Sequence, residues 1–90
     1  MGLLIIVEET FQFQDGTIHF APAVSFEVID RERIREGDRL ELRRPDGTAI
    51  MTTLHSLDFL KPSNGKCGLC VNRPRTKSDI PAGTEIWTIP

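Results

Sequence analysis

The chain has 90 residues, of which 39% are apolar and 27% charged, and its formal net charge is −2. This is the composition of one globular domain over residues 1–90, with too few residues for a second domain. It excludes a membrane-spanning helix, because the longest apolar run, Leu3–Val7, is far shorter than the roughly 18–20 residues that a bilayer requires.

The first half of the chain is predicted to be extended. Leu3–Phe13 is rich in β-branched and aromatic residues, and Asp15-Gly16 is typical of a hairpin turn. From Ile18 to Val28 apolar side chains alternate with others, which predicts a half-buried strand that Pro22 interrupts with a bulge or bend. The residues predicted to face inward are Ile18, Phe20, Pro22, Val24, Phe26 and Val28.

The second half continues this pattern after one weak helical candidate at Asp30–Glu36. Arg39–Arg43 alternates with Leu40 and Leu42 inward, and Pro45-Asp46-Gly47 predicts a second hairpin. The remaining predicted strands are Thr48–Leu57, Lys66–Asn72 and Thr84–Ile89. Six short strands with evenly spaced turns favour an all-β fold, specifically a small closed six-stranded antiparallel β-barrel, since closure leaves no apolar strand edge exposed.

Three motifs in this order resemble the second domain of elongation factor Tu, a translation-protein β-barrel of translational GTPases. They are Val7-Glu8-Glu9-Thr10-Phe11, Arg35-Glu36-Gly37-Asp38-Arg39-Leu40-Glu41-Leu42, and Cys67-Gly68-Leu69-Cys70-Val71 leading to Ser78-Asp79-Ile80-Pro81-Ala82-Gly83. The resemblance implies a six-stranded barrel without the GTPase domain, and the chain contains no phosphate-binding loop that ends in Gly-Lys-Ser or Gly-Lys-Thr. It also suggests that Glu8 and Glu9 correspond to the acidic pair with which tRNA-binding members help to hold aminoacylated tRNA.

The two cysteines form the Cys-x-x-Cys motif Cys67-Gly68-Leu69-Cys70. On a strand, residues three apart face opposite sides, so we expect Cys67 to enter the core with Leu69 and Val71 while Cys70 faces outward. We therefore predict no disulfide, no redox pair and no metal, although a thiol- or metal-dependent site remains the alternative. His19 and His55 lack a neighbouring nucleophile motif, and we interpret them as surface residues.

The charge distribution favours one surface. The segment Phe59–Ser78 contains five cations and no carboxylate, whereas the chain as a whole lacks the broad positive field of a non-specific nucleic-acid-binding protein. Most aromatic residues, namely Phe11, Phe13, Phe20, Phe26 and Trp87, are expected to fill the core. The predicted contact surface therefore consists of Phe59, Lys61, Lys66, Arg73, Arg75 and Lys77.

Together these features predict a cytoplasmic binding module for a protein or an RNA, with a link to tRNA or the ribosome suggested by the resemblance. We expect no catalysis, no cofactor, no DNA partner and no membrane association. A structural subunit that self-associates is a further alternative, because fold alone does not determine function.

Overall fold

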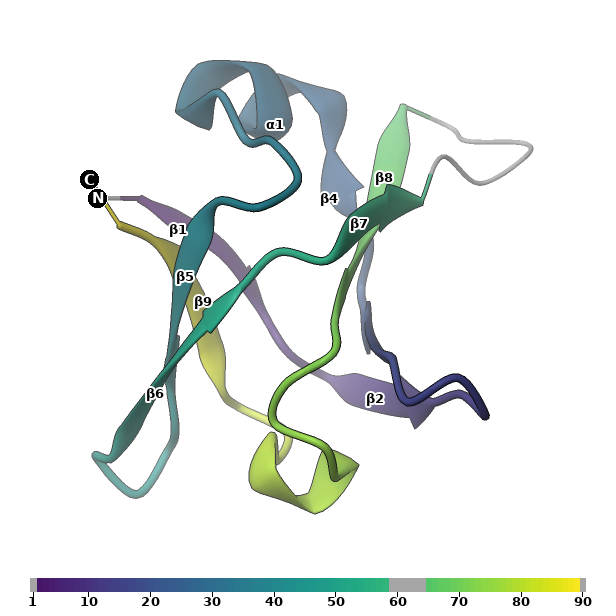
Figure 1. The fold of residues 1–90 in the computed structure, drawn as a ribbon. Helices are drawn as coiled ribbons and strands as arrows, with labels where there is room; N and C mark the ends of the chain where they lie inside the picture. Colours follow the sequence, from purple (N-terminus) through teal and green to yellow (C-terminus); the bar gives the residue numbers. More distant parts are fainter. Residues whose placement is uncertain (1, 59–64, 90) are drawn as a thin grey trace.

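The computed structural model describes residues 2–58 and 65–89, and its strands form two antiparallel sheets (Figure 1). The first sheet has the order β1 (Leu3–Ile6), β9 (Glu85–Thr88), β5 (Arg39–Arg43) and β6 (Ala49–Thr53). The second contains β2 (Glu9–Gln12), β3 (Ile18–Ala21), β8 (Lys66–Val71) and β4 (Val24–Ser25), with β7 (Ser56–Asp58) also paired to β8. A helix, α1 (Phe26–Glu32), and a short 3-10 helix, η1 (Lys77–Asp79), complete the described elements.

The chain passes directly from one sheet to the other at two places. After β1, the Val7 amide donates to the Thr84 carbonyl, whereas the next amide, that of Glu8, donates to the Ala21 carbonyl. After β6, the Leu54 amide donates to Asp38 and the His55 amide to Cys70. The predicted strands Leu3–Phe13 and Thr48–Leu57 are therefore each divided between the two sheets.

Both sheets contribute to one hydrophobic core. Leu40 and Leu42 of β5 are fully buried, as their alternation with charged residues predicts, and so are Ile18 of β3 and Ile86 of β9. The other members of this core are Leu4, Ile5, Val7, Phe20, Val24, Ile34, Leu54, Leu69, Val71 and Ile80. The alternation thus identified the inward face at Ile18, Phe20 and Val24, but the prediction for Pro22 was wrong, because this residue lies between β3 and β4 and is exposed.

The helical segment begins earlier than predicted, and the strand before it is shorter. We expected a strand up to Val28 and a helical turn over Asp30–Glu36, but α1 starts at Phe26. The Ser25 hydroxyl accepts a hydrogen bond from the Val28 amide and so caps the helix, which a period-two interpretation overlooks. Val28 and its neighbour Ile29 then pack against the core from a helix.

The aromatic residues of the first hairpin do not fill the core. Phe11 and Phe13 are 45% and 52% exposed, so the prediction that they are buried was wrong. Phe11 of β2 is paired with His19 of β3, and both lie on the face of the second sheet opposite to the one that carries Ile18 and Phe20. Phe20 alone of the five predicted aromatic residues is fully inside, while Phe26 and Trp87 are half-buried.

Both predicted hairpin turns are confirmed, and they use the same three residue types. In Asp15-Gly16-Thr17 and in Asp46-Gly47-Thr48, the glycine has a positive φ of 89° and 91°, respectively. In each turn the aspartate Oδ1 accepts hydrogen bonds from the threonine amide and from the threonine hydroxyl, the latter at 2.6 Å. These hydrogen bonds lower the pKa of both carboxyl groups below 3.8.

The Asp46 turn predicts a specific acid response. Because the pKa of Asp46 is lowered in the folded state, its ionised carboxylate stabilises the fold above pH 3.8, and this contribution is lost as the pH falls through the folded-state pKa. We expect the wild-type melting temperature to exceed that of Asp46→Asn at neutral pH, with the difference shrinking below pH 3.8. Thermal melts of both proteins across the acid range measure this, and a constant difference at all pH values would contradict it.

Among residues 2–58 and 65–89, no helix is long and apolar enough to cross a membrane.

Candidate functional site

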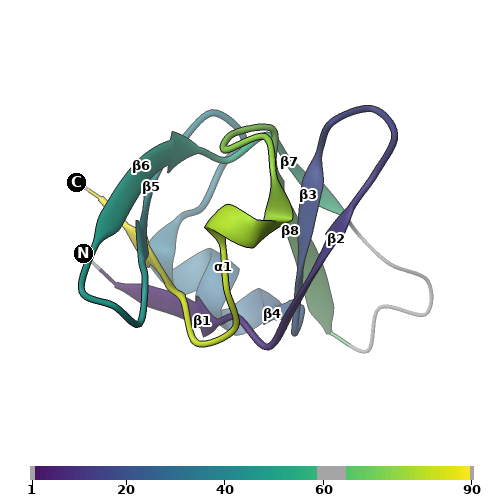
Figure 2. The same cartoon turned by 90° about the horizontal axis from the view of Figure 1, so that it is seen from below.

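A cleft of about 410 Å³ lies between the turn of the first hairpin and the segment that follows β8. It is lined by Asp15, Gly16, Asn72, Arg73 and Arg75. Seen from below, η1 and the segment before it lie between the β2–β3 hairpin and the β5–β6 hairpin (Figure 2). The cleft is thus formed by segments that are more than 50 residues apart in the sequence.

Side chains from both sheets hold the backbone of the segment after β8. The Gln12 Nε2 group donates a hydrogen bond to the Arg75 carbonyl. Its Oε1 accepts a hydrogen bond from the Lys77 amide at 3.3 Å. The Thr52 hydroxyl donates to the Arg73 carbonyl at 2.6 Å. The positions of Arg73 and Arg75 are therefore determined by contacts to their main chain, which leave the guanidinium groups available.

The two guanidinium groups are exposed, and within residues 2–58 and 65–89 neither makes a hydrogen bond or an ion pair. Arg73 also lines a second cleft of about 250 Å³ beside Arg39 and Met51. In the larger cleft the two arginines face one carboxylate, that of Asp15, which remains ionised because Thr17 lowers its pKa. The lining therefore has a net positive charge.

The predicted contact residues do not all lie together. Arg73 and Arg75 line the cleft, and Lys77 in η1 is joined to it through Gln12. Lys66 is the first residue of β8, at the end of that strand opposite to the one that leads to Arg73. Phe59 and Lys61 lie outside the described residues.

Two aromatic side chains that we had assigned to the core are instead exposed on the hairpin next to this cleft. The Phe13 ring stacks on the imidazole of His19, with 4.1 Å between the ring centroids and 21° between the planes. A two-residue Asp15-Gly16 turn would place Phe11 opposite the inward-facing Phe20, whereas the observed loop has three residues, 14–16, and pairs Phe11 with the outward-facing His19.

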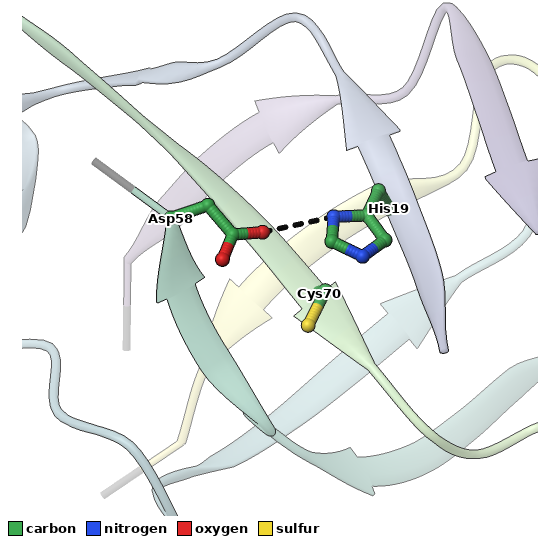
Figure 3. Close-up of side chains that lie close together, drawn as sticks. All are labelled: His19, Asp58 and Cys70. Carbon is green, nitrogen blue, oxygen red and sulfur yellow. Dashed lines mark ion pairs between the residues drawn. The ribbon is translucent and has the colours of Figure 1, made fainter. Parts of the chain in front are cut away.

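His19 belongs to a polar cluster on the outer face of the second sheet (Figure 3). Its Nδ1 lies 2.9 Å from Asp58 Oδ2, and the two side chains are 23% and 36% exposed. His19 is paired with Cys70 on β8, and Cys70 is paired with Ser56 on β7. The ligand atoms of His19, Asp58 and Cys70 all lie within 4.8 Å of one another.

A hydrogen-bond chain connects this cluster to the cleft. The Thr17 hydroxyl donates to Asp15 Oδ1 at 2.6 Å, since an ionised carboxylate can only accept. The Thr17 oxygen must then accept the hydrogen bond from His19 Nε2, which lies 3.1 Å away. The other imidazole nitrogen, Nδ1, faces Asp58 Oδ2.

The two cysteines have the orientations that strand alternation predicts, but both are buried. Cys67 shares the inward phase of Leu69 and Val71, while Cys70 shares the outward phase of Gly68 and lies among Ser56, Asp58 and His19. Burial raises the pKa of both thiols, which are free in the structure. Neither cysteine therefore has the features of an activated nucleophile.

The sequence does not predict the polar cluster as a group. His19 was interpreted as an isolated surface residue, and Asp58 was not selected at all. Their proximity to Cys70 depends on the pairing of β3 and β7 with β8, and no local motif encodes this pairing.

Comparison with known proteins finds no matching family model, no similar curated protein and no matching solved structure.

Proposed function

We propose that the chain is a non-catalytic RNA-binding module in which the cleft at Arg73 and Arg75 receives backbone phosphate. The observation that carries this proposal is the pair of exposed guanidinium groups without a partner among the described residues, on a backbone that Gln12 and Thr52 hold in place. A guanidinium group forms two parallel hydrogen bonds to a phosphate, and its planar shape makes it well suited to this contact.

The adjoining hairpin supports RNA over a generic anion. Phe11 and Phe13 are exposed, and their rings offer flat apolar surfaces on which unpaired bases stack. Aromatic rings beside a cationic groove are the combination with which proteins bind single-stranded nucleic acid. We therefore propose single-stranded RNA as the partner, bound through phosphate contacts at the arginines and base stacking at the phenylalanines.

We further propose that the two sheets form one closed six-stranded barrel of the translation-protein type. Two extended segments support this, because β1 leads into β2 and β6 leads into β7 without an intervening turn. With each of these segments counted as one strand, the pairings run around a complete ring. They are β2 with β3, β3 with β8, β8 with β7, β6 with β5, β5 with β9, and β9 with β1.

We propose a non-catalytic role because the polar groups beside the cleft are already engaged in hydrogen bonds and ion pairs with one another. Asp15 accepts two hydrogen bonds from Thr17, and both imidazole nitrogens of His19 are engaged, by Thr17 and by Asp58. Since the pKa of the Cys70 thiol is raised, it stays protonated near neutral pH. Among the described residues, the imidazole and the carboxylate beside it contact each other, so binding is the better-supported role.

The proposal predicts the effect of removing the two charges. We expect Arg73→Gln/Arg75→Gln to bind a fluorescein-labelled single-stranded RNA about tenfold or more weakly, because two phosphate contacts are lost. The slope of log K against log salt should also decrease by about 1.4, from about 0.7 per phosphate contact on a single strand. Fluorescence anisotropy at several salt concentrations measures both quantities.

A matched control distinguishes the loss of phosphate contacts in this cleft from a general loss of positive charge. Arg31 and Arg35 lie in and just after α1, at the far end of the molecule from η1 in Figure 1. Arg31→Gln/Arg35→Gln removes the same charge and should bind RNA as the wild type does, whereas Phe11→Ala/Phe13→Ala should bind more weakly. Equal losses in the two arginine variants, or no RNA binding by the wild type, would reject the proposal. Light scattering over a concentration series would then test self-association.

A further inference from the structure

We propose that His19, Asp58 and Cys70 form a binding site for a divalent transition-metal ion, of which zinc is the best match. The three residues belong to three neighbouring strands, β3, β7 and β8, and their side chains converge on the outer face of the second sheet (Figure 3). This site is separate from the arginine cleft, and the proposal does not depend on RNA binding.

The distances are close to those of a metal site. Zinc binds sulfur at about 2.3 Å and nitrogen or oxygen at about 2.0–2.2 Å, so the ligand atoms on a tetrahedral ion are about 3.3–3.8 Å apart. His19 Nδ1 and Asp58 Oδ2 are 2.9 Å apart, and the three ligand atoms lie within 4.8 Å of one another. The 2.9 Å separation is shorter than the tetrahedral value and the 4.8 Å limit is longer, so we infer that metal binding rotates these side chains within the present strand pairing.

The groups around the three side chains leave the correct ligand atoms available. Because His19 Nε2–H donates to Thr17, the lone pair of neutral His19 is on Nδ1, the atom that faces Asp58. A histidine whose second nitrogen donates to a fixed acceptor is the usual arrangement at metal sites, since it orients the ring. Thr17 is itself fixed by Asp15.

Cys70 has a comparable supporting contact. The Ser56 hydroxyl lies 2.8 Å from Cys70 Sγ and is able to donate a hydrogen bond to a thiolate. A bound metal ion removes the thiol proton, which leaves to solvent, and the thiolate then forms the metal–sulfur bond.

The donor set and its charge select the metal. One thiolate and one carboxylate together balance a 2+ ion, which makes the occupied site neutral. Sulfur, nitrogen and oxygen donors in one set are typical of zinc, whereas magnesium and calcium prefer oxygen donors alone. Asp58 is 36% exposed, so solvent reaches the site and water can fill the fourth position of a tetrahedral ion.

The chain offers a matched control for two of the ligands. It contains two cysteines and two histidines, and one residue of each kind lies in the proposed site. Zinc chloride and cobalt chloride are titrated into the full chain, with zinc affinity measured by competition against a chromophoric chelator. We expect one equivalent to bind, and cobalt to produce a thiolate-to-metal charge-transfer band.

Cys70→Ser and His19→Gln should each weaken zinc binding by at least about tenfold, and Cys70→Ser should abolish the cobalt band. Cys67→Ser and His55→Gln should retain both properties. Thr17→Val should weaken binding by about 10–100-fold through loss of the supporting hydrogen bond. Loss of the band in Cys67→Ser, or unchanged affinity in both Cys70→Ser and His19→Gln, would overturn the proposal.

A measurement on the wild type keeps the test valid if a variant fails to fold. X-ray absorption of the zinc-loaded protein should show one sulfur neighbour at about 2.3 Å and lighter neighbours at about 2.0–2.2 Å. A zinc environment without sulfur, or the absence of stoichiometric binding, would overturn the assignment. Neither result affects the RNA proposal, because that test uses different residues and a different ligand.

Discussion

Replacing Leu42 by alanine is expected to lower the free energy of unfolding by about 3 kcal/mol, within the range of about 2–5 kcal/mol for such a truncation. Leu42 is fully buried on β5, which pairs with β6 on one side and β9 on the other. Its side chain therefore has core neighbours and no space into which the surroundings can readily collapse. A domain of this size has a total stability of only about 5–13 kcal/mol, so the change removes a large fraction of it.

Urea denaturation followed by circular dichroism measures this effect as a lower midpoint with an unchanged slope. Met51→Ala is the control, because Met51 on the adjacent strand β6 is 54% exposed and its truncation should change stability by less than about 0.5 kcal/mol. Similar losses in the two variants would mean that Leu42 is not part of a tightly packed core.

Gly83→Ala is expected to have the second largest effect. Gly83 has a φ of +92°, a conformation that costs about 1–2 kcal/mol for a residue with a Cβ. A Cβ at this position would also lie 3.0 Å from Pro45 Cγ, which is tighter than an ordinary contact. Because Pro45 belongs to the β5–β6 turn, the added methyl group would press two loops apart at about 1 kcal/mol or more.

Gly47→Ala isolates the backbone part of this effect. Gly47 has nearly the same φ, +91°, and a Cβ there meets no atom within 4 Å. We expect Gly47→Ala to lose about 1–2 kcal/mol and Gly83→Ala about 1 kcal/mol more, measured by urea denaturation of both proteins. Equal losses would show that the Pro45 ring moves aside without cost.

Much of the fold was predictable because strand alternation and turn chemistry are local. Leu40 and Leu42 alternate with charged residues, and only one face of a pleated strand can then be buried. The two Asp-Gly-Thr turns follow from glycine's access to positive φ and from the threonine donors that hold each aspartate. The spacing alone therefore indicated strands and hairpins.

The errors arose where two local patterns competed. Phe26 and Val28 fit a strand by period two, but Ser25 caps a helix at the same place, and the packing of Val28 and Ile29 against the core favours the helix. Phe11 and Phe13 were predicted to face inward because the chain has only six aromatic residues with which to fill a core. Their face is determined by the hairpin register, which sets Phe11 opposite His19.

The candidate site was only partly predictable. Arg73 and Arg75 stood out because the segment around them has no carboxylate. The cleft also requires Asp15 and Gly16, which reach it only when the first hairpin lies against the segment after β8. Gln12 makes that connection, and its contacts to Arg75 and Lys77 span more than 60 residues.

Residue order and type were thus sufficient for a β-rich domain with its turns, its inward leucines and a cationic segment near the C-terminus. These properties depend on interactions between residues a few positions apart. The convergence of His19, Asp58 and Cys70 arises differently, from the register in which β3 and β7 pair with β8. Register between strands distant in sequence is selected by burial of the whole core, so only the folded chain decides which polar side chains meet on its outer face.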